Sequence, residues 1–574
     1  MLRRRLSSLP CISVILSISL FAFQFLPRTS SAQTGTGLGP VLQYIASNWD
    51  VLTRSMTRCD SVVDPKLPEA ALLYLPANFP EPDSVKQLEQ ACKVHVEQLP
   101  ATIQHPGQAD VSTISPQGLL FLPNSYVVPG GRFNEMYGWD SYFIILGLLH
   151  DRRIDLARGM VENFFFEIEH YGTVLNANRT YYLTRSQPPF LTSMIMEVYN
   201  AEKAAGHDDK DWLARAYGFA ARDYEMWTRE PHLAGSTGLS RYYDFGNGPA
   251  PEGAQDEAGL HRQVAGYFVV HPELARTYVV VKDGAQQAQA VVGPEYRVQV
   301  CDADQSMAHQ RCDAAGAIRL SADYYKGDRS MRESGFDISF RFGPYGAATH
   351  HFAPVCLNSL LYKTEEDLEE ISQLLGKNAE AGNWKQRAEQ RKKLVDKYLW
   401  DDQRGQFFDY DLRTESRSTY EYLATFYPLW AGLASPRQAQ AIARQVKVFE
   451  QPGGLATSPN ETGVQWDYPY GWAPLQLLAV EGLRRYGFTD DANRISSKFI
   501  STVAENFRRE GTIREKYNVV TRSSDVQVIA GYQANVVGFG WTNGVFLQLL
   551  QELPKEMIDR LAKEQDTTPP SSHR

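Results

Sequence analysis

Apolar residues recur at helical spacing along most of the chain. Residues 141–172, SYFIILGLLHDRRIDLARGMVENFFFEIEHYG, carry this spacing twice before a terminal glycine. A later segment, TEEDLEEISQLLG, has a capping-box-like start at Thr364 and Asp367 and ends at Gly376. Apolar positions that repeat every three to four residues let one face of a helix lie on a core. The pattern predicts a long succession of amphipathic helices joined by loops rich in Gly and Pro.

One segment breaks the helical pattern. ARTYVVVKDGAQQAQAVVGPEYRVQVCDAD, which begins at Ala275, is rich in Val and carries Asp283 and Gly284 between two apolar runs. A Gly-containing turn between such runs is typical of a β-hairpin. Residues 255–320 are therefore predicted to be an insertion with strands of its own. At the other end of the chain, residues 561–574 are predicted to be a disordered tail.

The first residues have the pattern of a targeting segment. Arginines at positions 3–5 precede the mostly apolar residues 12–26, and small residues follow up to Ala32. This order of charged, apolar and small residues is typical of a signal peptide. Residues 1–32 are predicted to be one, which would make the protein periplasmic or secreted; an uncleaved membrane anchor is the alternative. No other run of about 20 apolar residues is present, so no further membrane span is expected.

The cysteines permit two bridges. Cys59 with Cys92 and Cys301 with Cys312 are the expected pairings because each pair is close in sequence, although connectivity cannot be read from one sequence. Cys356 lies in the apolar stretch APVCLNSLLY, which predicts a buried free thiol. Such usage is compatible with export.

Composition narrows the class of partner. The net charge is −9 and the pI is near 5.8, which argues against nucleic acid or an anionic membrane as a partner, since both favour basic surfaces. Aromatic residues make up 12% of the chain. They suit a site for an amphipathic ligand such as a sugar, but large cores also use them.

Five loops between the predicted helices are unusually rich in charged and aromatic residues. Planar guanidinium, carboxylate and amide groups can meet pairs of sugar hydroxyls, and Trp or Tyr can meet the apolar face of a sugar ring. Each loop alone could equally be a cap, a turn or a surface ion pair, but five together favour a sugar site. They are residues 129–143, 176–190, 332–343, 462–476 and 513–519.

Two carboxyl groups in these loops suit cleavage of a glycosidic bond, which needs one protonated acid and one ionised carboxylate. Asp337 lies between Phe336 and Ile338, and such apolar neighbours favour the protonated form. Glu515 lies beside basic residues, which favour the ionised form. The alternatives are a helix cap for Asp337 and a surface ion pair for Glu515.

Other chemistries find little support. The sequence contains no GxSxG motif and no P-loop. The pair His350 and His351 has no helically spaced partner with an acid, so no zinc site is expected there. Neither a metal nor a cofactor is predicted.

The motifs resemble those of the trehalases, an inverting family of glycoside hydrolases. PGGRFNEMYGWDSYF and QWDYPYGWAP are similar to the two diagnostic motifs of that family. NANRTYYLTRSQPP, ESGFDISFR, EKYNV and GFGWTNGV resemble further motifs in the family order. The resemblance runs from about residue 40 to 552 and is interrupted mainly by the insertion. It implies an all-α fold, an (α/α) six-hairpin toroid over residues 33–560.

The resemblance also implies an activity and a set of residues. It implies hydrolysis of α,α-trehalose to glucose, with Asp337 as general acid and Glu515 as general base. The protein is further expected to be a monomer that needs no metal and has no stable membrane association after signal cleavage. The positions matching the sugar contacts of the family are Arg132, Trp139, Asp140, Asn176, Arg185, Glu252, Gln465 and Trp466.

Three positions depart from the family pattern. The place of a sugar-binding arginine two residues before Glu252 is taken by Ala250, and Phe336 replaces a tryptophan. The loop at 531–537 lacks the carboxylate that the family has there. These departures leave two alternatives open. The chain could be a related α-glucosidase acting on another small glucoside, or a sugar-binding protein with weakened turnover.

Overall fold

The computed structural model describes residues 37–63, 71–252, 258–281, 293–301, 312–531 and 534–567. The predicted signal peptide lies outside these residues. The predicted tail begins within helix α19 (Lys555–Thr567), and residues 568–574 are again outside. Residues 34–574 group into one compact unit, which is the part of the chain considered below.

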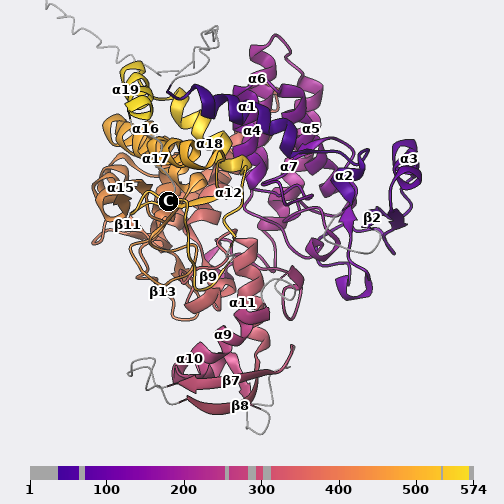
Figure 1. The fold of residues 1–574 in the computed structure, drawn as a ribbon, viewed down its shortest axis with the longest axis vertical. Coiled ribbons are helices and arrows are strands. Elements are labelled where there is room, and N and C mark those ends of the chain that lie inside the picture. The colour runs from indigo at the N-terminus through magenta and orange to yellow at the C-terminus, as the bar shows by residue number, and fades with distance from the viewer. Residues whose placement is uncertain are drawn as a thin grey trace, which may run out of the picture. The chain divides into compact units, whose positions relative to one another are not determined.

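Six of the described helices form a closed ring. Each contacts the next in chain order, and the last contacts the first. They are buried on nearly all sides, as expected for helices inside a fold; in α4, for example, nine of 11 residues are buried. Figure 1 shows α16 and α18 of this ring side by side. The six are α4 (Asp140–His150), α6 (Leu191–Ala204), α12 (Val355–Leu374), α14 (Tyr427–Trp430), α16 (Ala473–Arg485) and α18 (Gly540–Gln551).

Further helices pack against this ring from outside. Helix α5 contacts α4 and α6, α7 contacts α6 and α12, α13 contacts α12, and α17 contacts α16 and α18. The arrangement of paired inner and outer helices confirms the predicted all-α (α/α) toroid. The outer helices are α1 (Gly39–Leu52), α5 (Ile154–His170), α7 (Lys210–Trp227), α13 (Asn378–Tyr398), α15 (Pro436–Phe449) and α17 (Thr489–Glu510).

The ring closes where two glycines meet. A Cβ added at Gly544 of α18 would lie 1.9 Å from the carbonyl oxygen of Phe143, and one added at Gly147 would lie 2.7 Å from Cα of Gly544. Helices α4 and α18 therefore approach so closely that side chains at these positions would collide.

Local sequence signals set several helix ends. Ser435 and Gln438 form a capping box at the start of α15, with Pro436 in the first turn. Gly511 ends α17 with a φ of 68°. The predicted start at Thr364 is wrong, because α12 begins at Val355 and the Thr364 hydroxyl bonds back to the Leu360 carbonyl inside the helix.

The predicted insertion contains helices as well as strands. Helices α9 (Ala258–Val269) and α10 (Pro272–Tyr278) precede an antiparallel sheet of order β6-β8-β7, and Figure 1 shows α9, α10, β7 and β8 grouped beyond α11. Among the described residues β6 and β7 are separated by β8, so these two strands do not form the expected hairpin with each other. The turn at Asp283 lies outside the described residues. The strands are β6 (Val279–Val281), β7 (Tyr296–Cys301) and β8 (Cys312–Leu320).

A small parallel sheet near the N-terminus was not predicted from the sequence. Its order is β3-β2-β4, formed by β3 (Val94–Gln98), β2 (Ala71–Leu75) and β4 (Leu119–Leu120). Helices α2 (Cys59–Val62) and α3 (Asp83–Ala91) accompany this sheet.

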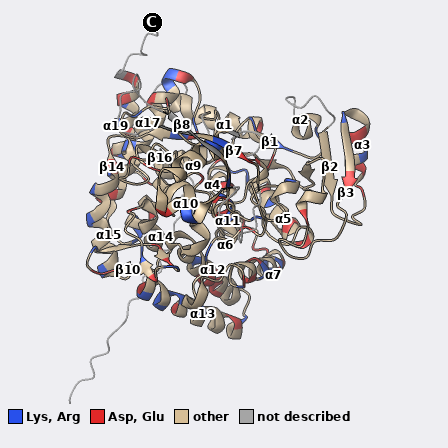
Figure 2. Cartoon of the chain, turned by 90° about the horizontal axis from the view of Figure 1, so that it is seen from below, with Lys and Arg blue, Asp and Glu red and all other residues tan. Residues whose placement is uncertain are grey.

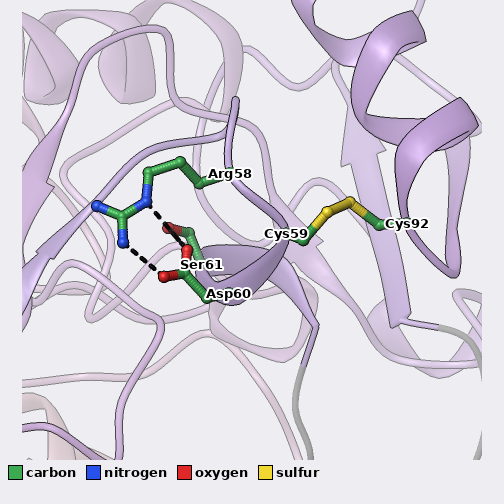
Figure 3. The surroundings of a disulfide bond; sticks show 5 residues. All are labelled: Arg58, Cys59, Asp60, Ser61 and Cys92. Carbon is green, nitrogen blue, oxygen red and sulfur yellow. Dashed lines mark hydrogen bonds and ion pairs between the residues drawn. A yellow bond between two sulfur atoms is a disulfide. The ribbon is translucent and has the colours of Figure 1, made fainter.

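Two of the cysteine predictions are confirmed. A disulfide joins Cys59 to Cys92, with the Cα atoms 5.7 Å apart, and Figure 3 shows Arg58 bonded to Asp60 beside it. Cys356 is buried and free. For the second predicted bridge, Cys301 and Cys312 are opposite each other in the register of β7 and β8. Their side chains lie outside the described residues, so this bridge stays a prediction.

Short strands and 3₁₀ helices shape the loops between the helices. The pair β16 and β17 lies in the region predicted to carry chemistry, and α11 (Ala322–Glu333) leads into the loop of Asp337. The short strands are β1 (Thr53–Arg54), β5 (Tyr126–Val127), β9 (Phe352–Ala353), β10 (Trp400–Asp401), β11 (Gln406–Phe407), β12 (Tyr410–Asp411), β13 (Ser416–Arg417), β14 (Glu450–Gln451), β15 (Gly454–Leu455), β16 (Tyr470–Trp472) and β17 (Lys516–Asn518).

The surface helices carry charges of both signs. Figure 2 shows Lys and Arg interspersed with Asp and Glu along helices such as α13. Within the described ranges, no helix combines the length and the apolar character that crossing a bilayer requires.

Candidate active site

The two predicted carboxyls lie on loops that the structure joins. Asp337 follows α11, and Glu515 immediately precedes β17, which pairs with β16. Gln465 connects them: its side-chain amide donates to the Asp337 carbonyl, and its Oε1 accepts from Lys516 Nζ at 3.1 Å. The same ammonium lies 3.2 Å from Glu515 Oε2. The fold therefore brings Asp337, Gln465 and Glu515 together.

A third carboxyl, Asp140, is electrostatically linked to the other two. It is the first residue of α4, and it is 5% exposed. Burial raises the pKa of Asp140 well above its usual value, and the charges of Glu515 and Asp337 raise it further. Burial and these neighbours therefore favour the protonated form of Asp140, which can donate a hydrogen bond.

Backbone contacts fix Glu515. Trp541 Nε1 donates to the Glu515 carbonyl at 3.1 Å, and the Glu515 amide donates to the Val536 carbonyl at 3.1 Å. The side chain of Asn535 exchanges hydrogen bonds with both backbone groups of Lys516. The loop that departs from the family pattern thus supports the strand of Glu515 through amide and backbone contacts.

Asp467, next to the predicted contact Trp466, has a structural role. Its carboxylate accepts from the Phe340 amide at 3.1 Å and from the Thr462 hydroxyl at 2.8 Å. Burial raises its pKa to about 6 despite these bonds. Asp467 therefore ties the loop of Gln465 to the loop of Asp337.

Aromatic rings form one wall of this region. Trp139 packs within 6 Å of Phe336, Trp466 and Trp541, at 5.8, 5.9 and 5.7 Å between ring centroids. Trp466 stacks on Trp472 at 3.9 Å. The predicted sugar contacts Trp139 and Trp466 are each only 2% exposed. A ligand can therefore contact little more than the edge of each ring.

A buried group of opposite charges lies at Arg185. Its guanidinium pairs with Glu252, lies 3.7 Å from Asp244 and is 2% exposed. The backbone N–H of Asn176 donates to the Arg185 carbonyl at 2.9 Å. The structure therefore brings the predicted residues Asn176, Arg185 and Glu252 together.

Sequence reasoning missed Arg332 in this group. Arg332 is 3% exposed and its Nη1 lies 4.0 Å from Glu252 Oε1. Burial alone would raise the pKa of Glu252, but Arg185, Arg332 and Arg329 outweigh it and lower the pKa. Arg329 and Arg332 are three residues apart on α11 and so share a face. Two arginines at that spacing, eight and five residues before Asp337, were the available signal.

Arg132 stands apart from the buried residues. It is exposed, and its guanidinium lies 4.7 Å from the Phe133 ring centroid. The loop around it is anchored by neighbours instead: Glu135 accepts from Arg179 at 2.6 Å, and the Trp139 amide donates to Gln187 at 2.9 Å. The 129–143 loop is thus held against the 176–190 loop, with Arg132 at the solvent side.

Fold and site together define the class. Paired carboxyls, buried arginines and aromatic rings gathered at the loops of an (α/α) toroid define a glycoside hydrolase. The Trehalase family model matches residues 63–288 and 299–554, and the chain belongs to the trehalase family.

Individual relatives agree with this assignment. A probable trehalase of Eremothecium gossypii is 35% identical over 559 residues, covering 87% of this chain and 70% of the relative. A cytosolic neutral trehalase of Kluyveromyces lactis is 38% identical over 457 residues, but the match covers only 55% of that relative against 74% of this chain. The solved structure of a neutral trehalase from Saccharomyces cerevisiae has a TM-score of 0.72 and 32% identity, covering 92% of this chain and 96% of that one.

The relatives overturn one sequence-based prediction. Those from Kluyveromyces lactis, Saccharomyces cerevisiae and Emericella nidulans carry the name cytosolic neutral trehalase. The prediction of a signal peptide and of a periplasmic or secreted protein conflicts with them and is wrong. The pattern behind it lies in residues 1–32, outside the described residues, and depends on composition alone.

Proposed function

We propose that the chain hydrolyses α,α-trehalose to two glucose molecules with inversion at the anomeric carbon. Asp337 protonates the glycosidic oxygen, and Glu515 removes a proton from the attacking water. An inverting site needs two carboxyl groups on opposite sides of the bond, with room for a water molecule. The observation that carries the proposal is the chain of contacts from the Asp337 backbone through Gln465 and Lys516 to Glu515, in a chain of the trehalase family.

The surrounding residues have complementary roles in this proposal. Asp140 hydrogen-bonds a sugar hydroxyl, and Lys516 holds the carboxylate of Glu515 in place. Gln465 couples the backbone of Asp337 to that lysine. The remaining proposed sugar contacts are Arg132, Trp139, Asn176, Arg185, Glu252 and Trp466. All of these groups come from one chain, which supports a site that is complete within a single subunit, and the two carboxyls can supply both acid and base without a metal.

Arg332 fills the role of the arginine that position 250 lacks. Ala250 is fully buried, and Arg329 donates to the neighbouring Pro249 carbonyl at 3.0 Å, so the backbone here leaves little space for a longer side chain. Arg332 instead reaches the Glu252 carboxylate from α11. A guanidinium at this place can contact sugar hydroxyls with its remaining donors.

We expect Arg332→Lys to raise KM for trehalose by about 10- to 100-fold, because a hydrogen bond to a charged group contributes about 1.5–3 kcal/mol. Lysine keeps the charge but loses the planar pair of donors. Initial rates over a range of trehalose concentrations measure this change. The thermal unfolding midpoint is followed in parallel, to separate lost contacts from lost folding. An unchanged KM with an intact fold would contradict the role given to Arg332.

Proton NMR tests the function directly. The protein is mixed with α,α-trehalose and the anomeric signals are followed through the first minutes. Inversion at one ring produces β-glucose from that ring and α-glucose from the other, so we expect equal early signals of both. Early α-glucose alone would contradict inversion. An unchanged trehalose signal, with turnover of another small glucoside, would favour the α-glucosidase alternative that the departures at Ala250 and residues 531–537 motivate.

A further inference from the structure

Asp323, His350 and His351 form a cluster outside the proposed sugar site. Asp323 lies in the first turn of α11, and both histidines lie in the 3₁₀ helix η5 (Thr349–His351). The Nε2 atoms of His350 and His351 lie 3.0 and 3.2 Å from Asp323 Oδ1. The sequence showed no acid at helical spacing from these histidines, but the fold supplies one from 27 residues earlier.

The distances between the three possible ligand atoms fit the coordination sphere of a metal ion. One ligand atom from each of the three residues lies within 4.8 Å of the others. Tetrahedral zinc has bonds of about 2.0–2.1 Å, which places neighbouring ligand atoms about 3.3 Å apart. The two nitrogen–oxygen distances are close to that edge length, so small side-chain adjustments would admit an ion.

The donor set and its setting suit a transition metal. Two imidazole nitrogens and one carboxylate oxygen are ligands that Zn²⁺ and similar ions prefer. The side chains of Asp323 and His351 are each 27% exposed, which leaves a path for an ion and for water.

Arg241 is a charged neighbour of the cluster. It donates from Nη1 to the His350 carbonyl at 3.1 Å. Without an ion, two imidazoles would have to direct their Nε2–H groups at one carboxylate oxygen. An ion among the three atoms would let each offer a lone pair instead.

We propose that Asp323, His350 and His351 bind one divalent transition-metal ion, with Zn²⁺ as the expected occupant and water completing its coordination. The ion would join the start of α11 to η5. Asp323 precedes Glu333, the last residue of α11, by ten positions, or about 15 Å along the helix. The site is therefore separate from the carboxyls of the proposed active site. It would fix the start of α11, the helix that leads to Asp337.

Calorimetric titration of ZnCl₂ into tag-free protein, after treatment with EDTA and removal of the chelator, tests the proposal. We expect one Zn²⁺ per chain, and no comparable binding of Mg²⁺, which prefers oxygen ligands. His351→Ala and Asp323→Asn should each weaken Zn²⁺ binding by about 10-fold or more, since even indirect supports of a metal site contribute that much. His105→Ala, which removes an exposed imidazole elsewhere, should leave the affinity unchanged.

Two further measurements keep the outcome decisive. Co²⁺ in place of Zn²⁺ should give visible absorption bands that are lost in His351→Ala, and Zn²⁺ should raise the thermal unfolding midpoint of the parent chain more than that of the variant. Equal Zn²⁺ affinity in the parent, His351→Ala and Asp323→Asn would place any bound ion elsewhere and overturn the proposal, as would the absence of binding. Because the readout is binding, neither result bears on trehalose hydrolysis.

Discussion

We expect Asp337→Asn to lower kcat for trehalose by about 10²–10⁴-fold, the usual contribution of a general acid. Asparagine has nearly the same shape as aspartic acid but has no proton to give to the leaving oxygen. Because Asp337 is only half-buried and its backbone is held by Gln465, the substitution should leave the fold intact. Initial rates with saturating trehalose, together with the thermal unfolding midpoint, measure the effect.

Asp140→Asn is the matched control for this variant. Burial raises the pKa of Asp140 well above its usual value, and Asp140 takes no part in the proton transfers proposed for Asp337 and Glu515. An amide at position 140 still donates a hydrogen bond, so this variant should keep far more activity than Asp337→Asn. Glu515→Gln should instead lose activity to a similar extent as Asp337→Asn, because no carboxylate would then activate the water. If Asp140→Asn were inactive and Asp337→Asn active, Asp140 would be the acid and the assignment of Asp337 would be wrong.

The order of helices could be predicted from the sequence because inner and outer helices both repeat apolar residues every three to four positions. Their boundaries were less certain. The predicted start at Thr364 failed because the preceding apolar stretch, read as a separate segment, continues the same buried helix from Val355. The pairing of β6 with β8 could not be predicted either, since it joins strands that are not neighbours along the chain.

For the candidate site, too, some features could be predicted from the sequence and others could not. Asp337 and Glu515 stand in motifs whose local sequence is distinctive, so their positions could be predicted. The bond from Gln465 to the Asp337 backbone, and the approach of Arg332 to Glu252, depend on which loops the ring of helices brings together. The local sequence around those residues does not indicate either contact.

A buried ion pair supports the loop of the proposed acid. Arg341, four residues after Asp337, donates from Nε and Nη2 to both carboxylate oxygens of Asp409, each at 2.7 Å. Asp409 also accepts from the Val355 amide at 2.8 Å, at the start of α12. Both charged side chains are almost fully buried, at 1% and 3% exposure. The pair therefore joins the Asp337 loop to an inner helix.

We expect Asp409→Asn to destabilise the protein by about 3–5 kcal/mol, because removing one partner leaves a buried charge without compensation. The aromatic rings around the guanidinium, including Phe336 at 5.1 Å, cannot replace the lost carboxylate. The thermal unfolding midpoint should fall, and kcat should fall with it at temperatures where the variant is still folded, since Phe336 directly precedes Asp337.

An exposed ion pair provides the control for this prediction. Arg437 and Asp402 approach to 2.8 Å, but their side chains are 79% and 62% exposed. Water and salt already screen such a pair, so Asp402→Asn should leave the unfolding midpoint unchanged. Replacing both buried charges, as in Arg341→Met with Asp409→Leu, should recover part of the stability lost in Asp409→Asn, because no charge is then left unpaired. If Asp409→Asn and Asp402→Asn shifted the midpoint equally, the buried pair would not hold the Asp337 loop, and the acid would have to be positioned by Gln465 and Asp467 alone.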